Sequence, residues 1–149
     1  EGGTESCRTR AAMLLRTLLL RSEVLMYVCD SADRFYSVAK SLTRAMEFVA
    51  RSSSTILFSP LVACYGCLIQ NQRARRVLSQ CLPASLQEDP MIDPVLLRLP
   101  LVLRNVLAED QETRRVLATF LQDVKMEQGR DWHDISPRKR EPPTRLWPF

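Results

Sequence analysis

The sequence predicts an all-α protein built from consecutive helices. Leucine recurs throughout the 149 residues, whereas aromatic residues make up 7% and glycine occurs only four times. This composition is typical of helical cores, because leucine favours helices and glycine weakens them. No segment alternates apolar and polar residues over the length of a strand, and no Asn-Gly hairpin turn occurs. Short links between the apolar faces favour a helical repeat or an irregular bundle.

Residues 1–52 contain two expected helices. After a flexible lead at residues 1–4, residues 5–20 predict a helix with four leucines on one side, Leu14, Leu15, Leu18 and Leu19. A short apolar segment follows at 24–29. The clearest helix comes next, with Ser31 as its N-cap and Asp33 in its first turn. Its stripe has the helical spacing of three and four: Phe35, Val38, Ala39, Leu42, Met46 and Val49.

Three serines at 52–54 end that helix, and the next is expected over 55–70. It is apolar over most of its circumference, which is typical of a central helix. Pro60 predicts a kink or a late start. A tight link then leads to a short helix at 73–81, which Pro83 stops.

The remainder of the chain is divided by prolines. Residues 84–94 read as a loop, and 95–107 as a helix broken or kinked at Pro100. Asp110 is suited to cap a last helix, whose stripe is Val116, Leu117, Phe120, Leu121 and Val124. We expect a helical domain over 5–128, with an insertion near 84–102, and a basic, proline-rich tail over 129–149.

The residue inventory excludes several classes of enzyme. Four glycines cannot form a phosphate-binding or dinucleotide-binding loop, and a single histidine, His133, cannot form a multi-histidine metal site. His133 falls in the predicted tail, where nothing would orient a catalytic base. We therefore expect no catalytic residues, no bound metal and no cofactor.

Five cysteines and no secretory signal indicate reduced thiols in a cytoplasmic or nuclear protein. Cys64 and Cys67 form a C-x-x-C pair, for which core packing is favoured over redox or zinc chemistry. The longest apolar stretch, 11–20, contains Arg16 and is too short to cross a membrane. Because the chain begins with Glu1, we expect a fragment or a processed product.

The net charge of +4 comes mostly from arginine and permits binding to acidic partners. Arg73, Arg75 and Arg76 open one expected helix, and Arg114 with Arg115 opens another. Arginines at a helix N-terminus can hold phosphate, so RNA or single-stranded DNA is one candidate ligand. A solvated helix face is the simpler interpretation, since few aromatic residues lie beside them for base stacking.

One segment resembles a known family. Residues 73–83 read Arg-Ala-Arg-Arg-Val-Leu-Ser-Gln-Cys-Leu-Pro and resemble the Arg-Ala-Arg-x-x-Leu-x-Gln-Cys-Leu-Pro segment of the Rcd/Caf40-like cell-differentiation family. Tyr27-Val-Cys29, Asp33-Arg34-Phe35 and Thr113-Arg-Arg115 resemble further family motifs. The similarity covers most of residues 5–126, which correspond to the C-terminal half of the family domain.

The resemblance implies an armadillo-like right-handed stack of helices, here only partial. The family supplies the armadillo-type subunit of the CCR4-NOT deadenylase complex. The implied partners are the large scaffold subunit of that complex and tryptophan-containing or helical peptides of translational repressors. Carried over to this chain, Tyr65 and Arg115 are the candidate peptide-binding residues. The leading hypothesis is a non-enzymatic adaptor in mRNA deadenylation; the alternative is a nucleic-acid-binding helical repeat that uses Arg73, Arg75, Arg76 and Arg114.

Overall fold

The computed structural model describes residues 4–81 and 100–134, and this part of the chain contains seven helices and no strand. The helices are α1 (Glu5–Leu19), α2 (Ser22–Cys29), α3 (Ala32–Ser52), α4 (Thr55–Leu68), α5 (Gln72–Gln80), α7 (Leu101–Glu109) and α8 (Gln111–Asp134). The predicted all-α class is confirmed.

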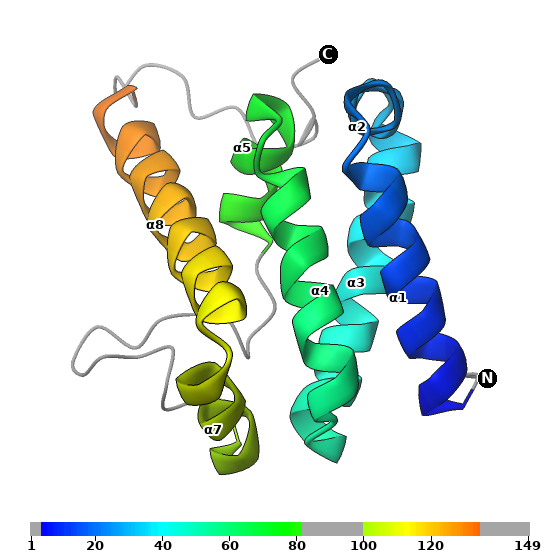
Figure 1. Cartoon of the computed structure of the whole chain (residues 1–149). Helices are drawn as coiled ribbons and strands as arrows, with labels where there is room; N and C mark the ends of the chain where they lie inside the picture. The colour runs from blue at the N-terminus through cyan, green and yellow to red at the C-terminus, as the bar shows by residue number, and fades with distance from the viewer. Residues whose placement is uncertain (1–3, 82–99, 135–149) are drawn as a thin grey trace.

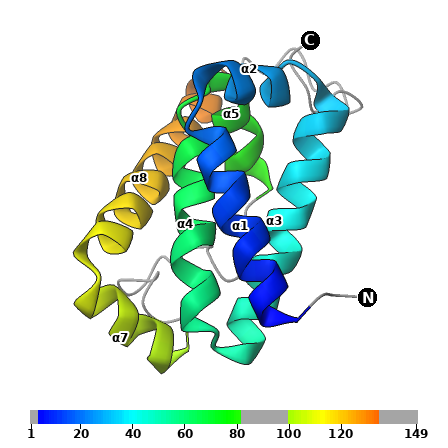
Figure 2. The same cartoon turned by 45° about the vertical axis from the view of Figure 1, so that its right-hand side comes forward.

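The three helices α1, α4 and α8 run side by side in one layer (Figure 1). The short helices α2 and α5 follow α1 and α4 at the same end of this layer, and α7 lies at the other end (Figure 2). A long helix followed by a short one thus occurs twice, which is the arrangement of a helical repeat. The central position expected for the helix beginning near residue 55 is confirmed, because α4 packs against α1, α3, α7 and α8.

Short polar side chains determine where several helices begin. The Ser54 hydroxyl accepts a hydrogen bond from the backbone N–H of Leu57 and caps α4. Ser53 adopts a left-handed conformation with φ of 56°, so the serines separate α3 from α4 as predicted. Asp110 accepts from the Thr113 N–H at 3.1 Å and caps α8, also as predicted. Each cap satisfies a backbone donor that the first helical turn leaves unpaired.

The core is formed by apolar stripes that meet on α4. The largest side chains with almost no exposure are Tyr65, Phe35, Phe58 and Phe120. The predicted stripe of the last helix is confirmed, since Leu117, Phe120, Leu121 and Val124 are buried and Val116 is half-buried. Gly66 allows α8 to approach, because a Cβ there would lie 2.6 Å from Val116 Cγ1.

The structure corrects two local expectations and agrees with a third. α4 begins at Thr55, so Pro60 does not delay its start; the ring is accommodated in the second turn. α8 continues to Asp134, so the tail does not begin at 129; one glycine costs a helix only about 1 kcal/mol. The break expected at Pro100 agrees with the start of α7 directly after this residue, which has φ of −52° and ψ of 146°; residues 95–99 lie outside the described part. Residues 82–99 and 135–149, with most of the expected insertion and tail, lie outside the described part.

Candidate functional site

Tyr65 and Arg115, the predicted peptide-binding residues, lie in different environments. Tyr65 is 1% exposed, and its ring centroid is 5.3 Å from that of Phe120 on α8. Burial raises the pKa of the Tyr65 hydroxyl above its ordinary value. Arg115 is exposed on the first turns of α8. The ring of Tyr65 is thus covered in this conformation, and peptide binding by either residue remains a prediction.

Two arginines at the start of α5 contact other parts of the protein. The Arg73 guanidinium lies 3.8 Å from the Asp30 carboxylate after α2. Arg75 donates from Nε and Nη2 to the backbone carbonyl of Ile69, at 3.2 and 3.1 Å. That carbonyl lies at the C-terminal end of α4, where helix carbonyls lack intrahelical partners. A phosphate at this position would compete with both contacts.

Arg76 joins α5 to α8. Its Nε lies 3.3 Å from Oε1 of Glu127, whose side chain is only 4% exposed. A buried carboxylate needs such a partner, so Arg76 has a structural role. Arg114 is exposed on α8. Nucleic-acid binding by these arginines remains a prediction.

The cysteine pair on α4 has the environment of core thiols. Cys64 is buried, and its Sγ donates to the backbone carbonyl of Ala12 at 3.4 Å. Burial raises the pKa of the Cys64 thiol to about 12 and also raises that of Cys67. The reactive thiolate is therefore disfavoured, which supports the packing interpretation. Among residues 4–81 and 100–134, no three His, Cys, Asp or Glu side chains cluster as metal ligands would. No helix in those ranges is long and apolar enough to span a bilayer.

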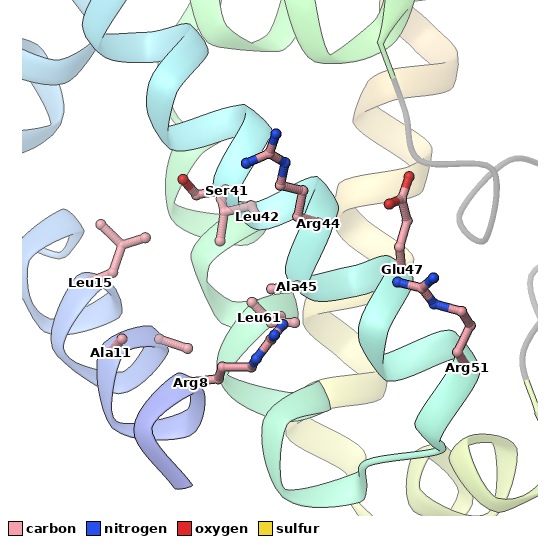
Figure 3. A pocket seen from close by; sticks show the side chains of 11 residues that line it. Arg8, Ala11, Leu15, Ser41, Leu42, Arg44, Ala45, Glu47, Arg51 and Leu61 are labelled. Carbon is pink, nitrogen blue, oxygen red and sulfur yellow. The ribbon is translucent and has the colours of Figure 1, made fainter. Parts of the chain in front are cut away.

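An open groove with a volume of about 550 Å³ runs between α1 and α3 (Figure 3). α1 contributes Ala11, Ala12 and Leu15 to it, α3 contributes Leu42 and Ala45, and α4 contributes Leu61. Leu42 and Leu61 are buried and belong to the core, so the floor of the groove is part of the packed interior. The alanines keep the groove open, because their side chains are too short to bridge the two helices.

Arginines surround this apolar floor. Arg8 extends from α1 into the groove (Figure 3). Its guanidinium carbon lies 4.3 Å from the centroid of the Phe48 ring. Arg44 and Arg51 stand on the exposed side of α3 together with Glu47. Within the described residues, the guanidinium groups of Arg44 and Arg51 form no ion pair or hydrogen bond. The rim is thus positively charged, with three arginines and one glutamate.

Sequence reasoning missed this groove because α1 has two apolar faces. The predicted side of four leucines is only partly a core face: Leu19 is buried and Leu15 packs against the core, whereas Leu14 and Leu18 are 63% and 43% exposed. Ala12, which was not predicted, is also buried on the core side. Ala11, Leu15 and Leu18, spaced by four and three, form a second stripe that signalled the groove in the sequence.

Comparisons with known proteins show where the chain belongs. A family model described as "Cell differentiation family, Rcd1-like" matches residues 1–124. Over 121 residues the chain is 31% identical to "Cell differentiation protein rcd1" of Schizosaccharomyces pombe, covering 81% of the chain and 38% of that protein. It is 30% identical over 122 residues to "Protein CAF40" of Saccharomyces cerevisiae, covering 81% of the chain and 30% of that protein. The chain therefore spans less than half of either relative, and it belongs to the Rcd1-like cell differentiation family.

Proposed function

We propose that the chain is a non-enzymatic adaptor of mRNA deadenylation, located in the cytoplasm or the nucleus. In this proposal it binds the large scaffold subunit of the CCR4-NOT complex and peptides of translational repressors. The family match over residues 1–124 carries the proposal, because the resemblance connects this family with the armadillo-type subunit of that complex.

Two structural features support a protein-docking function over an enzymatic one. The layer of α1, α4 and α8 is held by a continuous core and presents its exposed residues on a fixed scaffold, as a docking platform requires. The buried thiols are poor nucleophiles, because burial raises the pKa of Cys29 to about 11 and that of Cys64 to about 12.

Co-purification of the tagged full chain from the cells that express it, with nuclease added, tests the proposal. We expect the scaffold subunit to be recovered and to survive moderate salt. Arg115→Glu is expected to reduce the recovery of repressor peptides while retaining the scaffold. The matched control is Arg10→Glu, which reverses an exposed charge on α1 that does not line the groove.

Two results would contradict the adaptor proposal. One is a folded chain that is recovered without the scaffold. The other is a set of partners that disappears with nuclease, combined with direct RNA binding that weakens steeply with salt. The second result would favour the nucleic-acid alternative and direct attention to Arg114, whose exposed guanidinium is available to a phosphate.

A further inference from the structure

The second apolar stripe of α1 continues from the groove onto the surface. Ala11 and Leu15 line the groove, and Leu18 follows at the next helical position with 43% of its surface exposed. Beside it, Leu14 is 63% exposed. Isolated exposed leucines are common, but a stripe continuous with a groove is a feature of interaction surfaces. This face of α1 and the groove together form one apolar surface.

The opposite wall carries a net positive charge, because two arginines outnumber its single glutamate. Arg44 and Arg51 lie two helical turns apart on α3, so their side chains project from the same side. Glu47 lies between them, and Arg8 adds a further positive charge from α1. A partner seated on the apolar floor would therefore meet guanidinium groups along one edge.

We propose that this groove binds an acidic amphipathic helix of a partner protein. The apolar stripe of that helix would contact Leu15, Leu18 and the floor, and its carboxylates would face Arg44 and Arg51. Two helices with an apolar floor between them match helix-in-groove recognition, in which anchors occur at every third or fourth residue.

Two other occupants fit the rim less well. A second copy of the chain, paired through the same face, would bring Arg44 and Arg51 close to their own counterparts. Single-stranded nucleic acid would match the charge, but it binds through aromatic stacking platforms. None of the described side chains that line the groove is aromatic, and Arg8 covers the nearby ring of Phe48. The positive rim and the apolar floor of the groove together therefore favour an acidic amphipathic helix as the partner.

This inference rests on the docking role in the adaptor proposal and deepens it, because it assigns a helical partner of stated charge to one groove. The test uses the full chain and a labelled peptide of about 18 residues, about 27 Å long as a helix. Leucines in the peptide repeat at three and four residues, and glutamates flank them. A matched peptide carries lysine in place of every glutamate, and a single-stranded RNA is the third probe. Fluorescence anisotropy measures binding at low and moderate salt.

We expect the acidic peptide to bind and the lysine peptide to bind at least about tenfold more weakly. The double variant Arg44→Glu/Arg51→Glu should weaken the acidic peptide about tenfold and reduce its salt dependence. Ala11→Trp should abolish binding by filling the groove from an exposed position. Arg10→Glu is the control and should bind like the wild type. Circular dichroism establishes that each variant is folded.

Three results would overturn the proposal. The first is equal binding of both peptides, or equal loss in Arg10→Glu. The second is RNA binding that Ala11→Trp abolishes, which would make the groove a nucleic-acid site. The third is concentration-dependent dimerisation that Ala11→Trp abolishes, which would assign the groove to a second copy. Loss of scaffold recovery in cells would instead contradict only the adaptor proposal, so the two ideas fail separately.

Discussion

The two flanks of α4 are built differently. On one flank, Gly66 lets α8 approach, and the rings of Tyr65 and Phe120 pack at 5.3 Å. On the other flank, α1 and α3 both pack against α4 but leave a groove of about 550 Å³ between them. Large apolar side chains close the first flank, whereas alanines and outward arginines leave the second open. Both flanks contribute to the core, because α1, α3 and α8 all pack on α4, and in our proposal only the second flank also provides a binding surface.

The largest loss of stability is expected from Phe120→Ala, on the flank where α8 packs against α4. Phe120 is fully buried, so the substitution removes apolar contacts and leaves a cavity beside Tyr65. We expect a loss of about 3–5 kcal/mol in the free energy of unfolding. Urea denaturation followed by circular dichroism measures it. A loss below about 1 kcal/mol would contradict the described packing of α8 on α4.

The next effect concerns the close approach at Gly66. Gly66→Ala should destabilise the chain by about 1–2 kcal/mol, because its Cβ would overlap the stiff Val116 side chain. In a Val116→Ala background the same substitution should instead stabilise by up to about 1 kcal/mol, since alanine favours helices over glycine. A double-mutant cycle in urea measures the coupling. Additive effects would show that the helices do not meet at this point.

A smaller effect on thermal stability, which depends on pH, is expected at the N-cap of α8. The hydroxyl and N–H of Thr113 donate to Asp110 and, with Ser59, hold the pKa of that carboxyl below its ordinary 3.8. Asp110 therefore stabilises the fold fully above pH 3.8, and this contribution disappears as the pH falls through the lowered pKa. Asp110→Asn should lower the Tm at neutral pH. In acid, the Tm of the variant and that of the wild type should become equal. Parallel melting curves at every pH would contradict this.

The smallest effect on stability is expected on the other flank, where α1 and α3 border the groove. Leu18→Ser should change the free energy of unfolding by less than about 0.5 kcal/mol, because Leu18 is 43% exposed and lies outside the core. The same variant should weaken binding of the acidic peptide. Urea denaturation and anisotropy on one preparation measure both quantities. A loss of stability comparable with that of Phe120→Ala would show that α1 packs differently.

Local patterns predicted much of the fold but little of the candidate site. Asp110 was predicted correctly as the cap of α8, because a cap depends on residues within one turn. Ser31 also occupies the predicted N-cap position of α3, but its side chain makes no capping hydrogen bond. The stripe containing Phe120 was predicted because one face of α8 is clearly apolar. α1 was misread because periodicity shows that apolar faces exist, not which of two faces the core covers.

Long-range contacts of two candidate site residues could not be predicted from the sequence. Arg76 was a candidate for phosphate binding, yet it contacts Glu127, which is 51 residues away in the sequence. Tyr65 was a candidate for peptide binding, yet α8 covers its ring. Neither contact follows from neighbouring residues, because both depend on how α8 docks. Similarly, the groove depends on the spacing of α1 and α3, which local sequence does not determine.

The central claim is that this chain is a platform for docking proteins. Mixing the purified chain with the purified CCR4-NOT scaffold subunit, or with single-stranded RNA, tests it most directly. Analytical ultracentrifugation at low and moderate salt measures complex formation. We predict a complex with the scaffold that persists at moderate salt and no comparable complex with RNA. Salt-sensitive binding to RNA without any complex with the scaffold would contradict the claim.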